Sequence, residues 1–258
     1  MNCLIETALL THGLRSIANE ELAQSWHCPD AILAWVDGGE LKLGPIGEYL
    51  PFRERSEELI RIDLEEALQT GASGALTASG TMAVCRRLDI PMAITCGMGG
   101  IGDLRGEELC PDLPALMNIP VALISTSPKD MLDRPATLDW LRRHGVHTAG
   151  EPCTGYLFCG EPVALELPLS SCNNEAAVRR LTANGGLLIL NPIPEKERVQ
   201  DRSILVDAIK AGKQAEAEGR YYHPAANGEI DRRTGGYSSR IQLESIQQNY
   251  LLAKSIMD

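Results

Sequence analysis

A carboxylate and an amine stand out by residue type and position. Glu6 lies inside the apolar run 4–10, and a carboxylate in such a strand costs free energy unless it is paired or used. Apolar surroundings would raise its pKa and suit it to act as a general acid. A glutamate at a strand edge that faces solvent would have no such role, and the residues alone leave both interpretations open.

Lys129 follows the apolar run 121–125 and stands where we predict that a strand ends and a helix begins. A lysine in the first turn of a helix has the wrong sign for the helix dipole. The same positive field, together with partial burial, would lower the pKa of the amine and make it a better nucleophile. The alternative is a surface lysine without a chemical role.

The segment 96–106 is rich in glycine and follows a predicted strand. Its GxGGxG pattern is a poor dinucleotide fingerprint, because no helical apolar pattern follows it. We expect these glycines to let the backbone approach a ligand or turn tightly at the carboxyl edge of a sheet. Glu107, Glu108 and Asp112 come next; they are ligand types for magnesium or manganese, or else a solvated acidic loop.

The composition indicates a globular chain with a sizeable core. Of the 258 residues, 44% are apolar and 23% are charged, which is near the average for globular proteins. No linker or repeat stands out, so we predict a single domain over residues 1–258. The net charge of −11 and the small aromatic content (3 Trp, 6 Tyr and 2 Phe) argue against nucleic acid or an anionic membrane as a partner.

The cysteines and the amino terminus bear on the cellular compartment. The eight cysteines form no CxxC pair and are too sparse for a disulfide scaffold. The amino-terminal segment has neither the basic region of a signal peptide nor an apolar run near the ~18 residues of a membrane span. We therefore expect reduced thiols and a cytoplasmic protein.

Short apolar runs alternate with amphipathic segments, which predicts an α/β fold: a layered α/β/α sandwich around a mostly parallel sheet. The predicted strands are 3–10, 31–36, 91–96, 121–125, 163–167 and 187–190. The predicted helices are 13–26, 56–70, 81–88, 129–144, 174–183, 201–218 and 239–256. The polar, glycine-rich stretch 219–236 is predicted to be a long loop.

Taken in order, several segments resemble the pseudouridine-5′-phosphate glycosidase family, also called indigoidine synthase A-like. The resemblance covers almost the whole chain, and its most specific motif is NGGLLILNPIPE at 184–195. The other segments are LIETALLTHG (4–13), GALTASGTM (74–82), MGGIGDLRG (98–106), ELCPDL (108–113), PKDMLD (128–133) and TGG (234–236).

This resemblance implies an enzyme that cleaves, or reversibly forms, the C–C bond between uracil and ribose 5-phosphate through a lysine imine. Lys129 would be the nucleophile, Glu6 the proton donor and Glu108 the position of a divalent metal, manganese in the family. A C-glycosidic bond has no leaving oxygen to protonate, and an imine supplies the electron sink that lets it break. The resemblance also implies a homotrimer. The substrate-binding positions would fall on Ala78, Cys110, Pro111, Asp112 and Asn249.

Five positions depart from the family pattern. Glu58 stands where a family lysine contacts substrate, Cys110 replaces a serine, and Glu108 replaces an aspartate. Leu104 replaces a histidine, and Arg240 replaces an asparagine. Because Glu58 reverses the charge at a substrate position, we expect a substrate that differs at its 5′ end, unless a nearby arginine compensates. The candidates for this are Arg53, Arg55 and Arg61. The alternatives are the same imine chemistry on an unphosphorylated or different nucleoside-like C- or N-glycoside, and a catalytically silent paralogue that binds such a metabolite.

Overall fold

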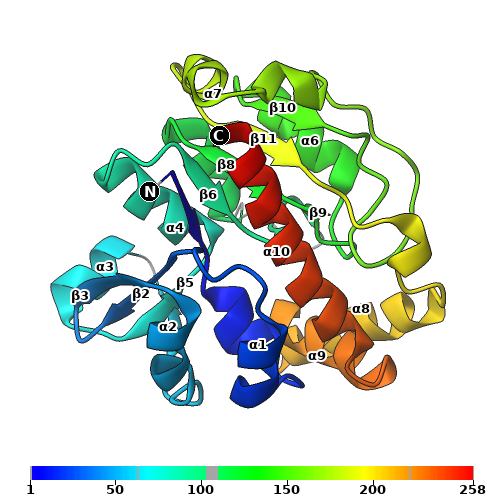
Figure 1. Cartoon of the computed structure of the whole chain (residues 1–258). Coiled ribbons are helices and arrows are strands. Elements are labelled where there is room, and N and C mark those ends of the chain that lie inside the picture. Colours follow the sequence, from blue (N-terminus) through cyan, green and yellow to red (C-terminus); the bar gives the residue numbers. More distant parts are fainter. Residues whose placement is uncertain (1, 63, 103–109, 221, 258) are drawn as a thin grey trace.

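The computed structural model describes residues 2–62, 64–102, 110–220 and 222–257 (Figure 1). Within these residues nine strands form one sheet in the order β10-β11-β8-β6-β1-β2-β5-β4, with β3 also paired to β2. The strands are β1 (Cys3–Ile5), β2 (Leu33–Asp37), β3 (Glu40–Gly44), β4 (Ile60–Ile62), β5 (Gly74–Leu76), β6 (Met92–Ile94), β8 (Ala122–Ser125), β10 (His147–Gly150) and β11 (Leu187–Leu190). Two short strands, β7 (Gly97–Met98) and β9 (Ser127–Pro128), pair separately.

Most neighbouring strands run parallel, and the exceptions are the two antiparallel pairs that β2 makes with β3 and with β5. The helices are α1 (Asn19–Ser25), α2 (Ile46–Arg53), α3 (Leu64–Thr70), α4 (Ala78–Arg87), α5 (Asp112–Asn118), α6 (Arg134–Arg143), α7 (Glu175–Leu181), α8 (Ser203–Ala217), α9 (Tyr222–Arg233) and α10 (Tyr237–Met257). Three single turns are η1 (Leu9–Gly13, a π-helix), η2 (Leu169–Cys172) and η3 (Glu195–Glu197).

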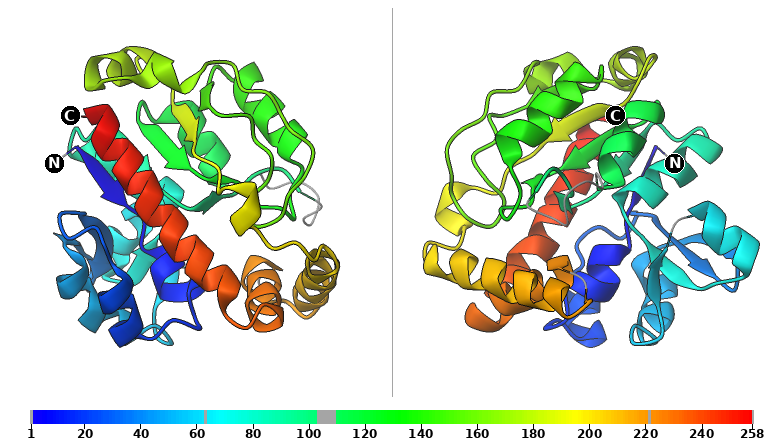
Figure 2. Two further views of the ribbon diagram at one scale, coloured as in Figure 1. Left: turned by 45° about the vertical axis from the view of Figure 1, so that its right-hand side comes forward. Right: turned by 180° about the vertical axis from the view of Figure 1, so that it is seen from behind.

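The two faces of the sheet belong to two apolar cores. Ile5, Ile94 and Ile124 point to one face and pack with α10, which crosses that face diagonally (Figure 2). Leu4 and Leu123, one residue away from these in each strand, point to the other face, which α4, α5 and α6 cover. Because successive side chains in a strand alternate between faces, burial of both faces requires the continuous apolar runs seen in the sequence. The predicted α/β/α architecture is confirmed.

Several predicted elements have different bounds. The strand at 187–190 is confirmed, whereas the predicted strand 3–10 ends at Ile5 and continues into η1. The stretch 163–167 contributes only isolated bridges, and the predicted helix 56–70 contains β4 ahead of α3. The elements β3, α2, β5, α5 and β10 were not predicted.

The predicted loop 219–236 is wrong, because α9 occupies most of it. Tyr222, Ala226 and Ile230 are buried at a spacing of four residues, so the helix has one apolar stripe despite its polar composition. Gly212 in α8 admits the ring of Tyr222, since a Cβ there would lie 2.7 Å from that ring. Packing against α8 therefore outweighs the weak helix propensity of the segment.

The predicted helix 129–144 begins at Arg134, five residues beyond Lys129. Asp133 caps this helix by accepting a hydrogen bond from the backbone of Ala136, and Pro135 fixes its first turn. Lys129 lies in the turn after β9. The expectation that a helix dipole acts on Lys129 from the first turn is therefore wrong, because that field falls off within one turn. Among the residues described, no helix is long and apolar enough to cross a membrane.

Candidate functional site

The carboxyl ends of five strands meet along one edge of the sheet. The segments that follow β1, β6 and β11 each donate backbone hydrogen bonds to the last residues of β5, β6 or β8. These bonds are Thr7 N to Leu76 O (3.2 Å), Glu6 N to Ile94 O (3.0 Å), Thr95 N to Ile124 O (2.9 Å) and Asn191 N to Ser125 O (2.9 Å). Open α/β sheets place their ligand sites at this edge, so we take it as the candidate site.

Glu6 is the first residue after β1 and is only 6% exposed. The Thr95 hydroxyl donates to its Oε1 at 2.7 Å. Burial raises the pKa of the neighbouring Cys96 thiol to about 11, and the negative charge of Glu6 adds to that rise. Glu6 is thus a buried, hydrogen-bonded carboxylate and not the solvent-facing strand-edge residue of the alternative interpretation.

Lys129 is half-buried, and both its backbone N–H and its backbone carbonyl form hydrogen bonds. Its N–H donates to Met98 O at 3.1 Å, and its carbonyl accepts from Leu132 N at 3.0 Å. Burial raises the pKa of the Cys110 thiol to about 12; the charge of Asp112 raises it further, and that of Lys129 lowers it. These charges act on the thiol because Lys129, Cys110 and Asp112 lie in one neighbourhood.

Asp112 connects that neighbourhood to the glycine-rich segment. Its Oδ2 accepts from Gly99 N at 2.8 Å, and its Oδ1 accepts from Ser79 N, in the first turn of α4, at 3.1 Å. A Cβ at Gly99 would lie 1.9 Å from the Cys110 sulfur, so the close approach requires glycine there. Ala78, buried beside Ser79, and Pro111, exposed beside Asp112, therefore join the same group.

Asn249, the predicted position near the carboxyl terminus, is fully buried in α10. Its Nδ2 donates to Thr95 O at 2.8 Å and to Thr126 Oγ1 at 3.2 Å, and its Oδ1 accepts from Asn191 Nδ2 at 3.0 Å. One amide therefore joins α10 to the ends of β6, β8 and β11. Asn191 belongs to the NPIPE motif, which the residues alone marked only as structural.

Two further polar side chains line this edge and were not predicted. The Tyr156 hydroxyl lies 2.9 Å from Gln242 Oε1 and 3.1 Å from Cys96 Sγ, with its ring almost completely buried. Gln242 belongs to a buried polar stripe of α10. A signal for it exists in the sequence, since Ser238, Gln242, Ser245 and Asn249 recur at helical spacing. Tyr156 has no such signal, because it lies in an irregular loop.

Glu58 lies apart from these residues. Its side chain is 77% exposed and is 3.9 Å from Arg55. It precedes β4, whose first residue Ile60 pairs with Gly74, whereas the candidate site lies at the Leu76 end of β5. The structure therefore does not bring Glu58 together with the other predicted site residues.

Of the three arginines proposed to compensate for Glu58, Arg53 and Arg55 are engaged by other groups. Arg53 is buried, and its guanidinium donates to the carbonyls of Leu10 (2.6 Å), Leu14 (3.0 Å) and Ile17 (2.8 Å) and to Asn19. Arg55 forms an exposed ion pair with Asp37 at 3.0 Å. The side chain of Arg61 lies outside the description. The guanidinium of Arg53 thus holds η1 and the residues that follow it, and the guanidinium of Arg55 binds Asp37 at the end of β2.

The predicted metal position, Glu108, lies outside the described residues, as does Glu107. Among the residues that are described, no group of three His, Cys, Asp or Glu side chains could hold a metal ion. Both carboxylate oxygens of Asp112 already accept backbone N–H groups. The described side chains alone therefore do not form a metal site.

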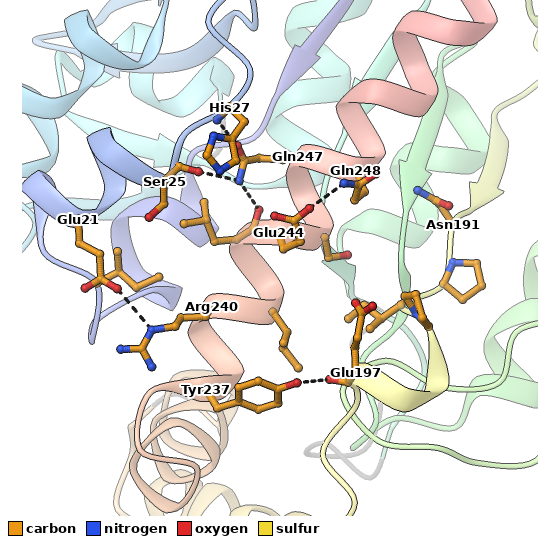
Figure 3. Close-up of a pocket in the computed structure, with 17 residues that line it drawn as sticks. Glu21, Ser25, His27, Asn191, Glu197, Tyr237, Arg240, Glu244, Gln247 and Gln248 are labelled. Carbon is orange, nitrogen blue, oxygen red and sulfur yellow. Dashed lines mark hydrogen bonds and ion pairs between the residues drawn. The ribbon is translucent and has the colours of Figure 1, made fainter.

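A pocket of about 670 Å³ lies over α10, between α1 and the segment 191–194 (Figure 3). Glu21 and Arg240 form an ion pair of 3.4 Å across one side, and the Tyr237 hydroxyl donates to Glu197 O on the other. Asn191 is among the lining residues, but Glu6 and Lys129 are not. The pocket therefore adjoins the polar network of the candidate site without containing its two reactive groups.

Comparison with known proteins identifies the family to which this chain belongs. The family model described as indigoidine synthase A like protein matches residues 4–257. A pseudouridine-5′-phosphate glycosidase from Methylobacterium nodulans is 28% identical, over 98% of this chain and 81% of its own length. The enzyme of the same name from Escherichia coli is 27% identical, over 98% of this chain and 88% of its own length. The expected family and the expectation of an enzyme are confirmed at this level.

Two solved structures share the fold. An indigoidine synthase A-like protein from Thermotoga maritima superposes with a TM-score of 0.81 at 22% identity, over 98% of this chain and 91% of that one. A prealnumycin C-glycosynthase in complex with ribulose 5-phosphate gives a TM-score of 0.76, also at 22% identity and with the same coverage. On the match of the family model over residues 4–257, the chain belongs to the indigoidine synthase A-like family.

Proposed function

We propose that this protein cleaves, and can form in reverse, the C–C glycosidic bond of a pseudouridine 5′-phosphate-like substrate through an imine on Lys129. One observation carries the proposal: the segment that follows β6 contacts both the side chain of Glu6 and the backbone of Lys129. Thr95 donates to Glu6 at 2.7 Å, and Met98 O accepts from Lys129 N at 3.1 Å. The candidate proton donor and the backbone of the residue that carries the amine are thereby held by the same short segment, at the edge where α/β sheets bind ligands.

In the proposed reaction the uncharged amine of Lys129 forms a bond to C1′ while the C1′–O4′ bond breaks. Glu6 supplies the proton that O4′ takes up, so that the sugar ring opens. The nitrogen, positively charged after the attack, loses a proton. Its lone pair then forms a C1′=N double bond, and the C1′–C5 bond breaks with its electrons going to the base, which takes up a proton at C5. Water hydrolyses the imine, which releases ribose 5-phosphate and restores the amine.

The neighbourhood of Lys129 supports binding of the sugar there. Gly99 approaches Cys110 and Asp112 without a side chain, and Asp112 fixes the first turn of α4 through Ser79. The pKa of the Cys110 thiol, raised to about 12 by burial, keeps it protonated at neutral pH. Cys110 is therefore a hydrogen-bonding group here and does not compete with Lys129 as a nucleophile.

The test measures uracil released from pseudouridine 5′-phosphate. Lys129→Ala and Lys129→Arg should both abolish release, because neither side chain supplies an uncharged amine. Lys210→Ala, at a lysine that is 73% exposed on α8, is the matched control and should retain the wild-type rate. Uracil release by Lys129→Ala at the wild-type rate would refute the proposal. A folded wild-type protein that releases no uracil from pseudouridine 5′-phosphate or from unphosphorylated pseudouridine would instead favour the silent paralogue.

One observation favours a second candidate, the same chemistry on a substrate that differs at its 5′ end. The guanidinium of Arg53 is occupied by the carbonyls of Leu10, Leu14 and Ile17, and Arg55 pairs with Asp37, so both of these arginines are engaged by other groups. The test compares kcat/KM for pseudouridine 5′-phosphate and for unphosphorylated pseudouridine. A preference for the phosphate below about tenfold supports this candidate, whereas a preference near a hundredfold, about 2.7 kcal/mol, shows that the protein has an anion pocket and rules it out.

A further inference from the structure

Asp130, the residue next to Lys129 in the chain, carries a carboxylate whose side chain is only 3% exposed. Its Oδ1 accepts from Tyr156 N at 2.8 Å, and its Oδ2 accepts from Leu157 N at 2.7 Å and from Phe158 N at 3.0 Å. Burial raises the pKa of this carboxyl, and the three N–H groups act against that rise. Both carboxylate oxygens are hydrogen-bonded, so the side chain of Asp130 is held in one position.

The loop that supplies these N–H groups is held by further contacts. Gly155 has a φ of +126°, which favours glycine, and a Cβ there would lie 2.0 Å from Phe158 O. The Arg134 guanidinium lies 3.4 Å from Asp130 and is 14% exposed. Arg198, on the far side, donates to Thr154 O at 2.9 Å and to Ile193 O at 2.6 and 2.9 Å. The loop is thus tied to α6 and to the NPIPE motif.

Tyr156 extends from this loop toward Glu6. A Cβ at Gly97 would lie 2.6 Å from the Tyr156 ring, so the ring packs directly on β7. Its hydroxyl reaches Cys96 Sγ at 3.1 Å, and Cys96 follows Thr95, the residue that donates to Glu6. A continuous connection therefore runs from Lys129 through Asp130, Tyr156 and Cys96 to the proton donor.

We propose that Asp130 is a positioning residue, whose carboxylate locks the backbone of Lys129 to the Tyr156 loop and thereby sets the place of the amine relative to Glu6. This inference rests on the proposed function, since it assumes that Lys129 is the nucleophile. Misplacement of a reacting group by about 1 Å can lower a rate about a hundredfold. A neighbouring residue that fixes the backbone of Lys129 therefore affects the reaction rate, whereas it would have no such effect next to a surface lysine.

The experiment traps the imine of Lys129 with ribose 5-phosphate. The amine and the open-chain aldehyde lose water to give the imine, and borohydride reduces it to a stable secondary amine that peptide mapping locates. The variants are Asp130→Asn, which keeps the shape but places an amide N–H₂ toward N–H donors, and Asp130→Ser, which shortens the side chain. Asp133→Ala is the matched control, because it removes the cap of α6 without contact to the Tyr156 loop.

We expect both Asp130 variants to lower the maximal trapping rate by about tenfold or more. The sugar concentration for half-maximal rate should stay within about twofold of the wild type, and nearly every chain should finally be labelled at Lys129. Asp133→Ala should trap at the wild-type rate. These readouts separate positioning from partial unfolding, which lowers the labelled fraction and leaves the rate of the remaining molecules unchanged.

The inference is overturned if the Asp130 variants trap at the wild-type rate, if only their labelled fraction falls, or if Asp133→Ala slows trapping equally. In each of these cases the wild type is still labelled at Lys129, so the proposed function stands. A wild type that is not labelled at Lys129 overturns the imine proposal itself and the inference with it.

Discussion

Thr95 donates a hydrogen bond from its hydroxyl to Oε1 of Glu6, and the two atoms lie 2.7 Å apart. Glu6 follows β1 and Thr95 follows β6, and these two strands are parallel neighbours. The backbone carbonyl of Thr95 also accepts from Asn249 in α10. One residue therefore orients the candidate proton donor and ties it to the long helix that covers this face of the sheet.

Glu6→Gln should lower uracil release about 10²- to 10⁴-fold, the usual contribution of a general acid, because the amide cannot supply the proton. Thr95→Val should lower it about tenfold to a hundredfold, since a hydrogen bond to a charged group is worth about 1.5–3 kcal/mol. Steady-state assays of both variants check this prediction. Thr70→Val, at an exposed hydroxyl of α3, is the control; a Thr95→Val enzyme as active as that control would contradict the assigned role of Thr95.

Arg53→Ala should destabilise the protein by about 3–5 kcal/mol, because it leaves the carbonyls of Leu10, Leu14 and Ile17 without their donor. The measurement is the free energy of unfolding in urea. Arg55→Ala removes a guanidinium that is 45% exposed, and it should cost no more than about 1 kcal/mol. Equal losses in the two variants would show that the bonds from Arg53 to η1 do not stabilise the fold.

The Cys96 thiol should make the protein less stable in alkali. Burial raises its pKa from 9.0 to about 11 in the folded state. The stability contributed by the protonated thiol is therefore complete below about pH 9 and is lost as the pH rises toward 11. The expected loss is about 3 kcal/mol. Unfolding free energies between pH 8 and 11 should fall less steeply for Cys96→Ala than for the wild type or for Cys159→Ser. Identical slopes in all three proteins would contradict the prediction.

Chelation tests the divalent cation that the family resemblance assigns to Glu108. Exhaustive treatment with a chelator should abolish uracil release, and added manganese should restore it. Glu108→Gln should require more manganese for half-maximal activity, because it removes one negative ligand. Full activity after chelation, with no metal found by elemental analysis, would show that the reaction needs none.

The sequence predicted the architecture because the strands are buried on both faces. Runs such as 187–190 are apolar throughout, and only a sheet covered by helices on both sides buries them completely. The prediction of a loop at 219–236 was wrong because Tyr222, Ala226 and Ile230 are too few to show a helical period among polar neighbours. Their burial depends on contacts with α8, which lie in the tertiary structure and not in the local pattern.

The sequence predicted the candidate site in part. Glu6 was recognisable because a carboxylate in an apolar strand is costly, and the motif register led to Lys129, Asp112 and Asn249. Asp130 and Tyr156 could not be predicted, since a loop 26 residues away supplies the partners of Asp130. Glu58 was predicted from motif register alone, and the structure places it at the other end of β4.

Borohydride reduction during turnover of pseudouridine 5′-phosphate, followed by mass mapping of the peptides, tests whether Lys129 forms the imine. We expect uracil to be released in proportion to the labelled chains, with the reduced ribose 5-phosphate attached to Lys129. We expect neither product from Lys129→Arg. Release of uracil without label at Lys129, or stable label at another lysine, would contradict an imine on Lys129.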